Sequence, residues 1–393
     1  MIFKEVVVMP KRKKEKMHAA IFYGPNNIAN EEIYFNYYQH QYRNEKGDSE
    51  EGVLLRVNAC AVCGYDVRVF RNGHQKVTPP IILGHEICGQ IDKDITTTTT
   101  ADSSTSTTYT IIKAGSRVAL SPIIPCLNCR YCYNRQYNLC INLKEIGSSI
   151  NGGFAEFVRI PEKIIKIGGL VPVPDNLSDE EAALLEPLSC CLNGLSHIGP
   201  IRKESTMIII GDGPIGLLHL QLSKMLYGIK TIVVGKIPQR IQKAKSMGAD
   251  ATVAVAEDSD HSEQNSDNVL EFTEGIGADI VIIATSNPTA LDMAIRVAAK
   301  NSKINIFSGM TKANPSLSSI SLNPNWLHYN QISITGSFSA TPIMLQQATR
   351  LAEDKVVDLS KIITHRYSLA DIKEAILATE KYYGLRAVIN RFS

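Results

Sequence analysis

The chain has 393 residues, of which 44% are hydrophobic, so it holds enough apolar material for two domains with separate cores. Its 41 basic and 39 acidic residues are interspersed and leave a formal net charge of +2, which argues against a surface for nucleic acid or for a membrane. No apolar run approaches the ~18 residues that a bilayer span requires. We therefore expect a small-molecule partner, and, because no signal peptide is recognisable, a cytoplasmic location.

The basic segment PKRKKEK at residues 10–16 precedes the first strand-like run, MHAAIFYG, which a Gly-Pro turn closes. Met17 is therefore the expected start of the fold, and residues 1–16 are an N-terminal extension. Further along, the segment TTTTTADSSTSTTYT at 96–110 is polar and without periodicity. It predicts a solvated loop inserted between strands.

Two short stretches before residue 90, ACAVCGYDVRVF and PPIILGHEICG, carry a possible metal site. Cys63, His85 and Glu86 are a thiolate, an imidazole and a carboxylate, the mixed set that catalytic zinc uses when one coordination position stays open. A single cysteine on an apolar strand and a single histidine in a turn are more often packing residues. The zinc hypothesis therefore depends on the rest of the chain.

Four cysteines follow one another within fifteen positions. Cys126, Cys129, Cys132 and Cys140 have the spacing C-x2-C-x2-C-x7-C, and nine cysteines in a reducing compartment are not expected to form disulfides. Four thiolates close a tetrahedron and leave no position for substrate, so the spacing predicts a structural zinc site. An iron–sulfur cluster is the alternative.

A glycine-rich turn lies between an apolar strand at 206–210 and an amphipathic helix. In the GxGxxG pattern, Gly211 permits the tight turn, Gly213 lets the backbone approach a pyrophosphate, and Gly216 allows close packing of helix on strand. Together with Pro214 and Ile215 they are the predicted cofactor-binding turn, whose helix N-terminus attracts phosphate. The strands TIVVG, ATVAV, ADIVIIAT, KINIFSG and QISITGSF complete a six-stranded doubly wound sheet.

The GHE element, the CGxD element, the four-cysteine lobe, EPLSCCLNGL and the GxGPIG turn follow in this order. In this order they resemble the zinc-dependent medium-chain dehydrogenases of the zinc-containing alcohol dehydrogenase superfamily, in particular the sorbitol or iditol (polyol) and threonine dehydrogenase branch. The resemblance covers nearly the whole chain from Met17. It implies an α/β fold with a GroES-like, β-rich catalytic domain at 17–187 and 338–393, and a doubly wound Rossmann domain with a parallel sheet at 188–337.

The resemblance also implies roles for individual residues. Cys63 and His85 are the catalytic zinc ligands, and either Glu86 or Glu186 supplies a carboxylate ligand. Asp66 is the acid that orients the histidine. With the cysteine lobe, the chain is expected to bind two zinc ions.

Two residues near the catalytic cysteine depart from the family pattern. Tyr65 stands where relatives usually carry a serine or threonine that relays the substrate proton, and a phenol can also donate and accept. Arg68 replaces a histidine of the threonine dehydrogenase type, which argues against that substrate. The expected reaction is therefore hydride transfer between a nicotinamide cofactor and a secondary alcohol, polyol or sugar, or the matching ketone.

Two other classes remain open at this stage. A zinc-independent quinone or enone reductase would share the fold, but it should lack Cys63, His85 and the cysteine lobe. A non-catalytic zinc-ribbon binding protein would leave the glycine-rich turn without a purpose.

The cofactor is expected to be NADP(H) in preference to NAD(H). NAD-specific relatives place an acid at the end of the second nucleotide-domain strand, where this chain has Gly235 followed by Lys236. A glycine leaves space for a 2′-phosphate, and Lys236 and Arg240 are cations that can pair with it. Arg386 is also predicted to contact the cofactor. A homodimer or homotetramer is expected, because apolar edge strands need cover.

Overall fold

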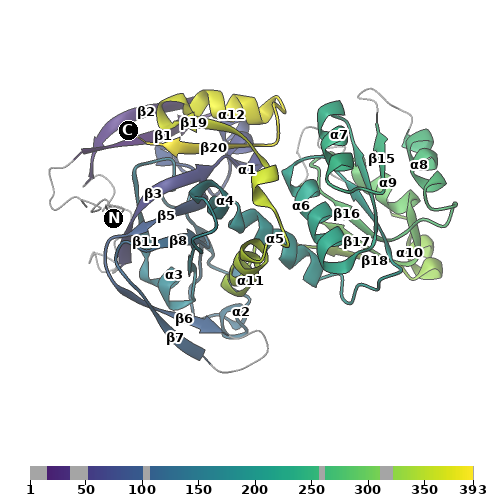
Figure 1. Cartoon of the computed structure of the whole chain (residues 1–393), viewed down its shortest axis with the longest axis horizontal. Coiled ribbons are helices and arrows are strands. Elements are labelled where there is room, and N and C mark those ends of the chain that lie inside the picture. Colours follow the sequence, from purple (N-terminus) through teal and green to yellow (C-terminus); the bar gives the residue numbers. More distant parts are fainter. Residues whose placement is uncertain (1–15, 36–51, 101–106, 256–261, 310–321, 393) are drawn as a thin grey trace. The chain divides into compact units, whose positions relative to one another are not determined.

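The structure is a computed structural model, and it describes residues 16–35, 52–100, 107–255, 262–309 and 322–392 (Figure 1). Its contacts divide the chain into two units. Unit 1 runs to Ser189 and resumes over Ala340–Glu353 and Leu359–Ser393, whereas unit 2 comprises Cys190–Ser339 and Asp354–Asp358. Residues 1–15 of the expected N-terminal extension lie outside the described residues. Among the described residues, no helix has the length and apolar character needed to cross a membrane.

Unit 1 is built mainly of strands. They are β1 (Lys16–Gly24), β2 (Asn27–Tyr34), β3 (Gly52–Ala61), β4 (Ile81–Ile82), β5 (Glu86–Ile91), β6 (Ile95–Thr100), β7 (Thr107–Ile112), β8 (Arg117–Leu120), β9 (Ile123–Ile124), β10 (Lys144–Glu145), β11 (Phe157–Pro161), β12 (Leu170–Pro172), β19 (Ile363–Ser368) and β20 (Arg386–Arg391). Its helices are α1 (Gly64–Asn72), α2 (Arg130–Tyr133), α3 (Glu162–Lys166), α4 (Asp179–Ala183), α11 (Pro342–Glu353) and α12 (Ile372–Glu380). Helix α5 (Leu185–Ser196) carries the chain from unit 1 into unit 2.

The main sheet of unit 1 joins strands from both ends of the chain. Its order is β12-β8-β5-β3-β20-β19, with β11 also paired to β3. Val388 of β20 lies opposite Ala61 of β3 in an antiparallel ladder. Buried residues alternate along the first part of β3, as expected for a strand with one face on the core. This arrangement is the GroES-like, β-rich domain that the sequence predicted.

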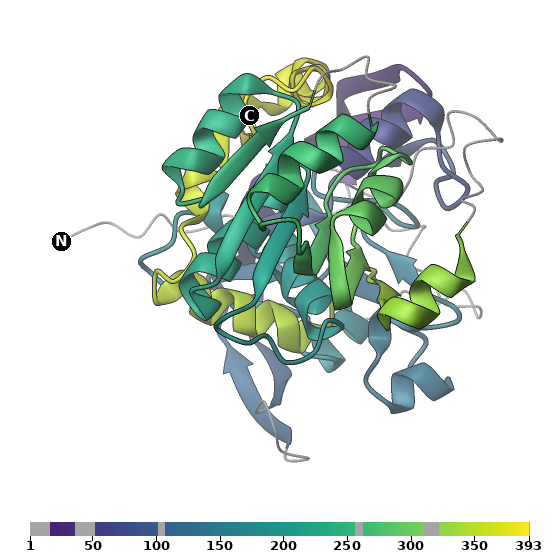
Figure 2. The same ribbon diagram turned by 90° about the vertical axis from the view of Figure 1, so that its right-hand side faces the viewer.

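The Thr-rich segment does not form the loop that the sequence predicted. Strands β6 and β7 pair as an antiparallel hairpin that projects from unit 1 (Figures 1 and 2), and residues 101–106 between them lie outside the described residues. Ile95 and Ile112 are buried in the core of unit 1, and the buried Thr97 hydroxyl donates to the Ile165 carbonyl at 2.8 Å. Threonine is β-branched and favours strands, so the run of threonines at 96–100 is compatible with β6 although it is polar.

Unit 2 is a parallel sheet covered by helices (Figures 1 and 2). Its strands are β13 (Thr206–Ile210), β14 (Lys230–Gly235), β15 (Ala251–Ala254), β16 (Ala278–Ile283), β17 (Ala298–Ile306) and β18 (Ser333–Gly336), in the order β15-β14-β13-β16-β17-β18. Its helices are α6 (Pro214–Leu222), α7 (Pro238–Ser246), α8 (Ser262–Glu271), α9 (Ala290–Arg296) and α10 (Pro324–Asn330). The central strands are continuous buried runs, as parallel sheets require. The prediction of six strands is confirmed.

Candidate active site

Cys63, His85 and Glu86 meet at the ends of three elements in unit 1. Cys63 is the residue before α1, His85 lies between β4 and β5, and Glu86 begins β5. One ligand atom from each residue lies within 4.8 Å of the other two. The turn before His85 requires glycine, because Gly84 has a φ of +90° and a Cβ there would lie 2.8 Å from the Cys60 sulfur. The structure therefore brings the predicted mixed ligand set together.

Asp66 supports two of these residues from behind. Its side chain is fully buried, and Oδ2 accepts a 2.8 Å hydrogen bond from the backbone amide of Cys63. Oδ1 lies 3.6 Å from Nδ1 of His85 and accepts a longer bond from the amide of Gly84. Since Nδ1 faces this carboxylate, Nε2 is the nitrogen left for a metal.

Glu86 is a buried carboxylate with few donors around it. Its Oε1 lies 3.2 Å from Nη2 of Arg386, yet among the described residues neither carboxylate oxygen receives a well-aligned hydrogen bond. The guanidinium of Arg386 compensates part of this buried charge, and both carboxylate oxygens keep lone pairs that a metal ion can take. The thiol, imidazole and carboxylate are also the donor types that zinc accepts. The residues therefore fit a zinc ion.

Tyr65, Glu186 and Arg386 were also predicted as site residues, but they are not among the three residues whose ligand atoms lie together. Tyr65 packs edge-on against the ring of His85, with centroids 5.7 Å apart, and its hydroxyl lies 3.4 Å from Nδ1 of His74. Burial raises the pKa of Tyr65 to about 12. Glu186, in α5, is buried but is not one of the three residues whose ligand atoms lie together. Arg386 is buried in unit 1, where Nη1 donates to the Val62 carbonyl at 3.0 Å.

The cysteine lobe forms a second possible metal centre in unit 1. The ligand atoms of Cys126, Cys129, Cys132 and Cys140 lie within 4.8 Å of one another. The sulfur of Cys132 is 3.5 Å from that of Cys129 and 3.9 Å from that of Cys126. A zinc–sulfur bond of about 2.3 Å implies sulfurs about 3.8 Å apart in a tetrahedron, so the lobe fits zinc. Backbone amides of Ile141 and Cys132 lower the pKa of Cys129 to about 6, whereas burial raises the pKa of Cys132 to about 12 and also raises that of Cys140. A cation between the sulfurs would therefore be needed for all four to be thiolates.

The glycine-rich turn in unit 2 has the geometry that its pattern predicts. Gly211 has a φ of +129°, and a Cβ on Gly216 would lie 1.9 Å from the Gly211 carbonyl oxygen. At Gly213, by contrast, a Cβ would meet only Nη1 of Arg240, at 3.8 Å. Pro214 begins α6, where its missing N–H costs nothing. The turn thus keeps open the side on which a phosphate would approach.

The end of β14 differs from the prediction. We expected Gly235 to leave an open space, but a Cβ there would lie 2.4 Å from both Cβ and Oδ2 of Asp212. The Asp212 side chain therefore fills that space, which makes the expectation wrong. Lys236 is exposed, and Arg240 is buried. Sequence reasoning missed Asp212 because it lies in the turn after β13, not at the end of β14.

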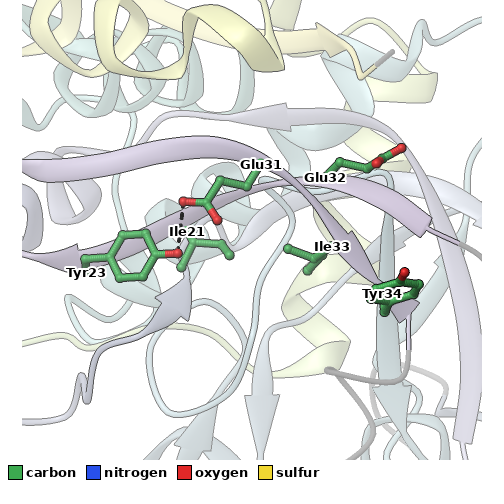
Figure 3. A pocket seen from close by; sticks show the side chains of 6 residues that line it. All are labelled: Ile21, Tyr23, Glu31, Glu32, Ile33 and Tyr34. Atoms are coloured by element: carbon green, nitrogen blue, oxygen red, sulfur yellow. Dashed lines mark hydrogen bonds between the residues drawn. The ribbon is translucent and has the colours of Figure 1, made fainter.

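A pocket in unit 1 lies between β1 and β2 (Figure 3). It is lined by Ile21, Tyr23, Glu31, Glu32, Ile33 and Tyr34. The Tyr23 hydroxyl donates to Oε1 of Glu31 at 2.9 Å, so two of its polar groups satisfy each other. None of its residues is a predicted site residue.

Comparison with known protein families identifies the class. Residues 49–175 match the alcohol dehydrogenase GroES-like domain, and residues 214–354 match the zinc-binding dehydrogenase domain. The chain belongs to the zinc-dependent medium-chain alcohol dehydrogenases, and it is an oxidoreductase.

Individual relatives cover most of the chain. D-Arabitol-phosphate dehydrogenase of Enterococcus avium and sorbitol dehydrogenase of Bacillus subtilis are each 29% identical over 333 residues, which are 83% and 84% of this chain and 86% of each relative. A solved zinc-binding dehydrogenase from Sinorhizobium meliloti, bound to NADP, superposes with a TM-score of 0.77 at 26% identity. That match covers 96% of this chain and 100% of the other.

Proposed function

We propose that the chain transfers a hydride between a nicotinamide dinucleotide and a secondary alcohol or polyol, or runs the reverse reaction on the matching ketone. The observation that carries the proposal is the group of Cys63, His85 and Glu86, with Asp66 behind the histidine. The sugar-alcohol substrates named for the Enterococcus and Bacillus relatives support the polyol class.

A bound zinc ion supplies Lewis acidity, which favours the ionised form of a substrate alcohol and polarises a carbonyl. The protein holds the ligands in place: Asp66 fixes the ring of His85 and the start of α1 at Cys63. Tyr65 is the proposed group through which the hydroxyl proton leaves, and Nδ1 of His74 is 3.4 Å from its hydroxyl. In oxidation the carbon-bound hydrogen leaves as hydride to the nicotinamide, and the hydroxyl hydrogen leaves as a proton.

We also propose two zinc ions per chain, one in the group of Cys63 and one in the cysteine lobe. The first would keep a position open for substrate, because within the described part of the chain three residues bring ligand atoms together there. Glu86 is the proposed carboxylate ligand, and Glu186 is the alternative. The lobe, with four thiolates, is proposed to be structural.

A preference for NADP(H) stays a prediction. It now depends on Lys236 and Arg240 alone, because the space beside Gly235 is filled. The NADP in the Sinorhizobium structure supports use of this cofactor. Arg386 as a cofactor contact, a homo-oligomeric state and a cytoplasmic location are further proposals.

A substrate screen tests the function. Purified protein is incubated with zinc, then with secondary alcohols, polyols and sugars in the presence of NAD+ or NADP+, and the absorbance of the reduced cofactor is followed. We expect turnover with at least one polyol or secondary alcohol, and its loss in Cys63→Ala. Turnover of enones or quinones that survives removal of zinc would instead support the zinc-independent reductase.

A further inference from the structure

Asp212 is a buried carboxylate that the reaction described above leaves without a role. It is 8% exposed and lies in the glycine-rich turn between Gly211 and Gly213. We infer that its carboxylate recognises the ribose of the adenosine half of the cofactor, and so acts as a specificity-determining residue. The inference rests on the proposed use of a nicotinamide dinucleotide.

The side chain of Asp212 lies beside the end of β14, where an acid that binds ribose is expected. In dinucleotide-binding sheets, the acid that binds the ribose hydroxyls stands at the end of the second strand. Here that strand is β14, and it ends at Gly235, which has no side chain. The Asp212 side chain extends from the turn after β13 toward Gly235. A Cβ on Gly235 would lie 2.4 Å from both Cβ and Oδ2 of Asp212, so the aspartate occupies that position. The carboxylate is therefore supplied from the neighbouring strand.

The hydrogen bonds of Asp212 hold this carboxylate in place. Its Oδ2 accepts from the backbone amides of Lys236 at 2.8 Å and Ile237 at 2.7 Å, the first two residues after β14. Both of its side-chain hydrogen bonds within the described part of the chain go through Oδ2. Since no described residue donates to Oδ1, the lone pairs of this oxygen are open to a donor from a ligand.

NAD(H) and NADP(H) differ at the 2′ position of the adenosine ribose, and a carboxylate there interacts differently with each. A ribose with free 2′ and 3′ hydroxyls offers two donors to a carboxylate, and such charge-assisted bonds are strong. A 2′-phosphate offers an anion, which a nearly buried carboxylate repels with little screening. Asp212 thus favours binding of NAD(H), whereas the cations Lys236 and Arg240 favour binding of NADP(H). The balance between these groups sets the cofactor preference.

The glycine at 235 follows from the same geometry. Any larger residue there would collide with Asp212, so Gly235→Asp is not a useful way to introduce an acid. The informative change is Asp212→Asn, because the amide oxygen can still accept from Lys236 and Ile237 while the charge is lost. Asp279→Asn is the matched control: this exposed aspartate, in the same unit, accepts the backbone amide of Thr206 at 2.8 Å.

The test measures binding without turnover. AMP, 2′-deoxy-AMP and adenosine 2′,5′-bisphosphate are titrated into wild type and both variants by calorimetry, and NADH and NADPH by fluorescence. We expect wild type to bind AMP more tightly than 2′-deoxy-AMP. We expect Asp212→Asn to shift the NADPH to NADH affinity ratio toward NADPH by roughly tenfold or more, the size expected for one charge-assisted hydrogen bond, and Asp279→Asn to leave it unchanged.

The possible failures are distinguishable. If wild type binds AMP and 2′-deoxy-AMP equally, or if folded Asp212→Asn keeps the wild-type ratio, Asp212 only ties the end of β14 and the inference is wrong. The comparison of the two nucleotides needs no variant, so it decides the matter even if Asp212→Asn does not fold. If wild type binds neither a dinucleotide nor AMP, the proposed function fails as well.

Discussion

Asp66 contacts three neighbours that decide where the candidate zinc ligands lie. Its carboxylate accepts the amides of Cys63 and Gly84 and faces Nδ1 of His85. A fully buried carboxylate lowers the stability of the folded protein unless it is hydrogen-bonded, and these three contacts supply that compensation for Asp66. The sequence predicted the pairing with His85 from resemblance, but the bonds to the two backbone amides depend on the fold of the turn.

We expect Asp66→Asn to weaken zinc binding at the catalytic centre by about 10–100-fold and to reduce kcat/KM, because the histidine loses the acceptor that orients it. The measurement is zinc affinity by competition with a chelator, alongside activity. Asp94→Asn is the control, since Asp94 is an exposed aspartate of unit 1 that accepts the amide of Ala114. Equal zinc affinity in Asp66→Asn and wild type would contradict the assignment.

The buried histidine His219, in α6 of unit 2, is expected to make the stability of the protein depend on pH. Its ring is fully buried against Phe307, and among the described residues neither ring nitrogen has a hydrogen-bond partner. Burial lowers its pKa to about 3. The unfolded chain, with a pKa near 6.5, then binds more protons than the folded chain between about pH 3 and 6.5.

The contribution of His219 to stability is therefore fully present above pH 6.5 and is lost as the pH falls. The slope is at most about 1.4 kcal/mol per pH unit. Thermal melts at pH 7.5, 6 and 5 should show a smaller decrease in Tm for His219→Leu than for wild type. His328→Leu, at an exposed histidine of the same unit, should behave as wild type. An identical decrease in all three proteins would show that His219 is already protonated or does not titrate.

Helices, strands and turns whose stabilising contacts lie close together in sequence could be predicted from the sequence pattern. The strand at 206–210, the glycine-rich turn and the following helix are adjacent in sequence, and each has its own periodicity. The hairpin of β6 and β7 was not predicted, because its polar threonine run shows no apolar periodicity. Its contacts with the rest of unit 1, such as the bond from Thr97 to the Ile165 carbonyl, are made with residues far along the chain. Asp212 was missed because its partners lie 24 and 25 residues further along.

The cysteine lobe allows a prediction at this scale. Cys129→Ser opens a site of four thiolates in a lobe with few apolar residues, so we expect the loss of one zinc and a Tm lower by several degrees. Cys63→Ser should lose a different zinc with a smaller change in Tm, since its surroundings are packed by the core of unit 1. Metal analysis and calorimetry of both variants provide the test. Two zinc ions retained in Cys129→Ser would disprove the structural site.

At the scale of the whole molecule, the two ends of unit 1 come together in one sheet through β20 and β3. This pairing joins residues more than 300 positions apart, and no local pattern specifies it. Only the resemblance to the family predicted a domain built from both ends of the chain. Strands β13, β14 and β16 of unit 2 could be predicted directly, because each is a nearly continuous apolar run. Strand β17 was predicted only from its apolar end, since its first half contains Lys300 and Asn301.

The edges of the sheet in unit 2 lead to a prediction about assembly. Among the described strands, β18 pairs with β17 alone, so its other side carries backbone groups that can pair with a second chain. We expect a homodimer or homotetramer with two-fold symmetry. Light scattering at micromolar concentration should give a multiple of the chain mass of 43.2 kDa. A mass equal to one chain would refute it.

Transfer of a labelled hydrogen is the most direct measurement of the central claim. A secondary alcohol or polyol that turns over is prepared with deuterium on the carbinol carbon, and the reduced cofactor is analysed by mass spectrometry. The account predicts one deuterium in the nicotinamide ring with zinc-loaded wild type and no reduced cofactor with Cys63→Ala. Reduced cofactor without deuterium, or equal turnover by Cys63→Ala, would contradict hydride transfer at the centre formed by Cys63, His85 and Glu86.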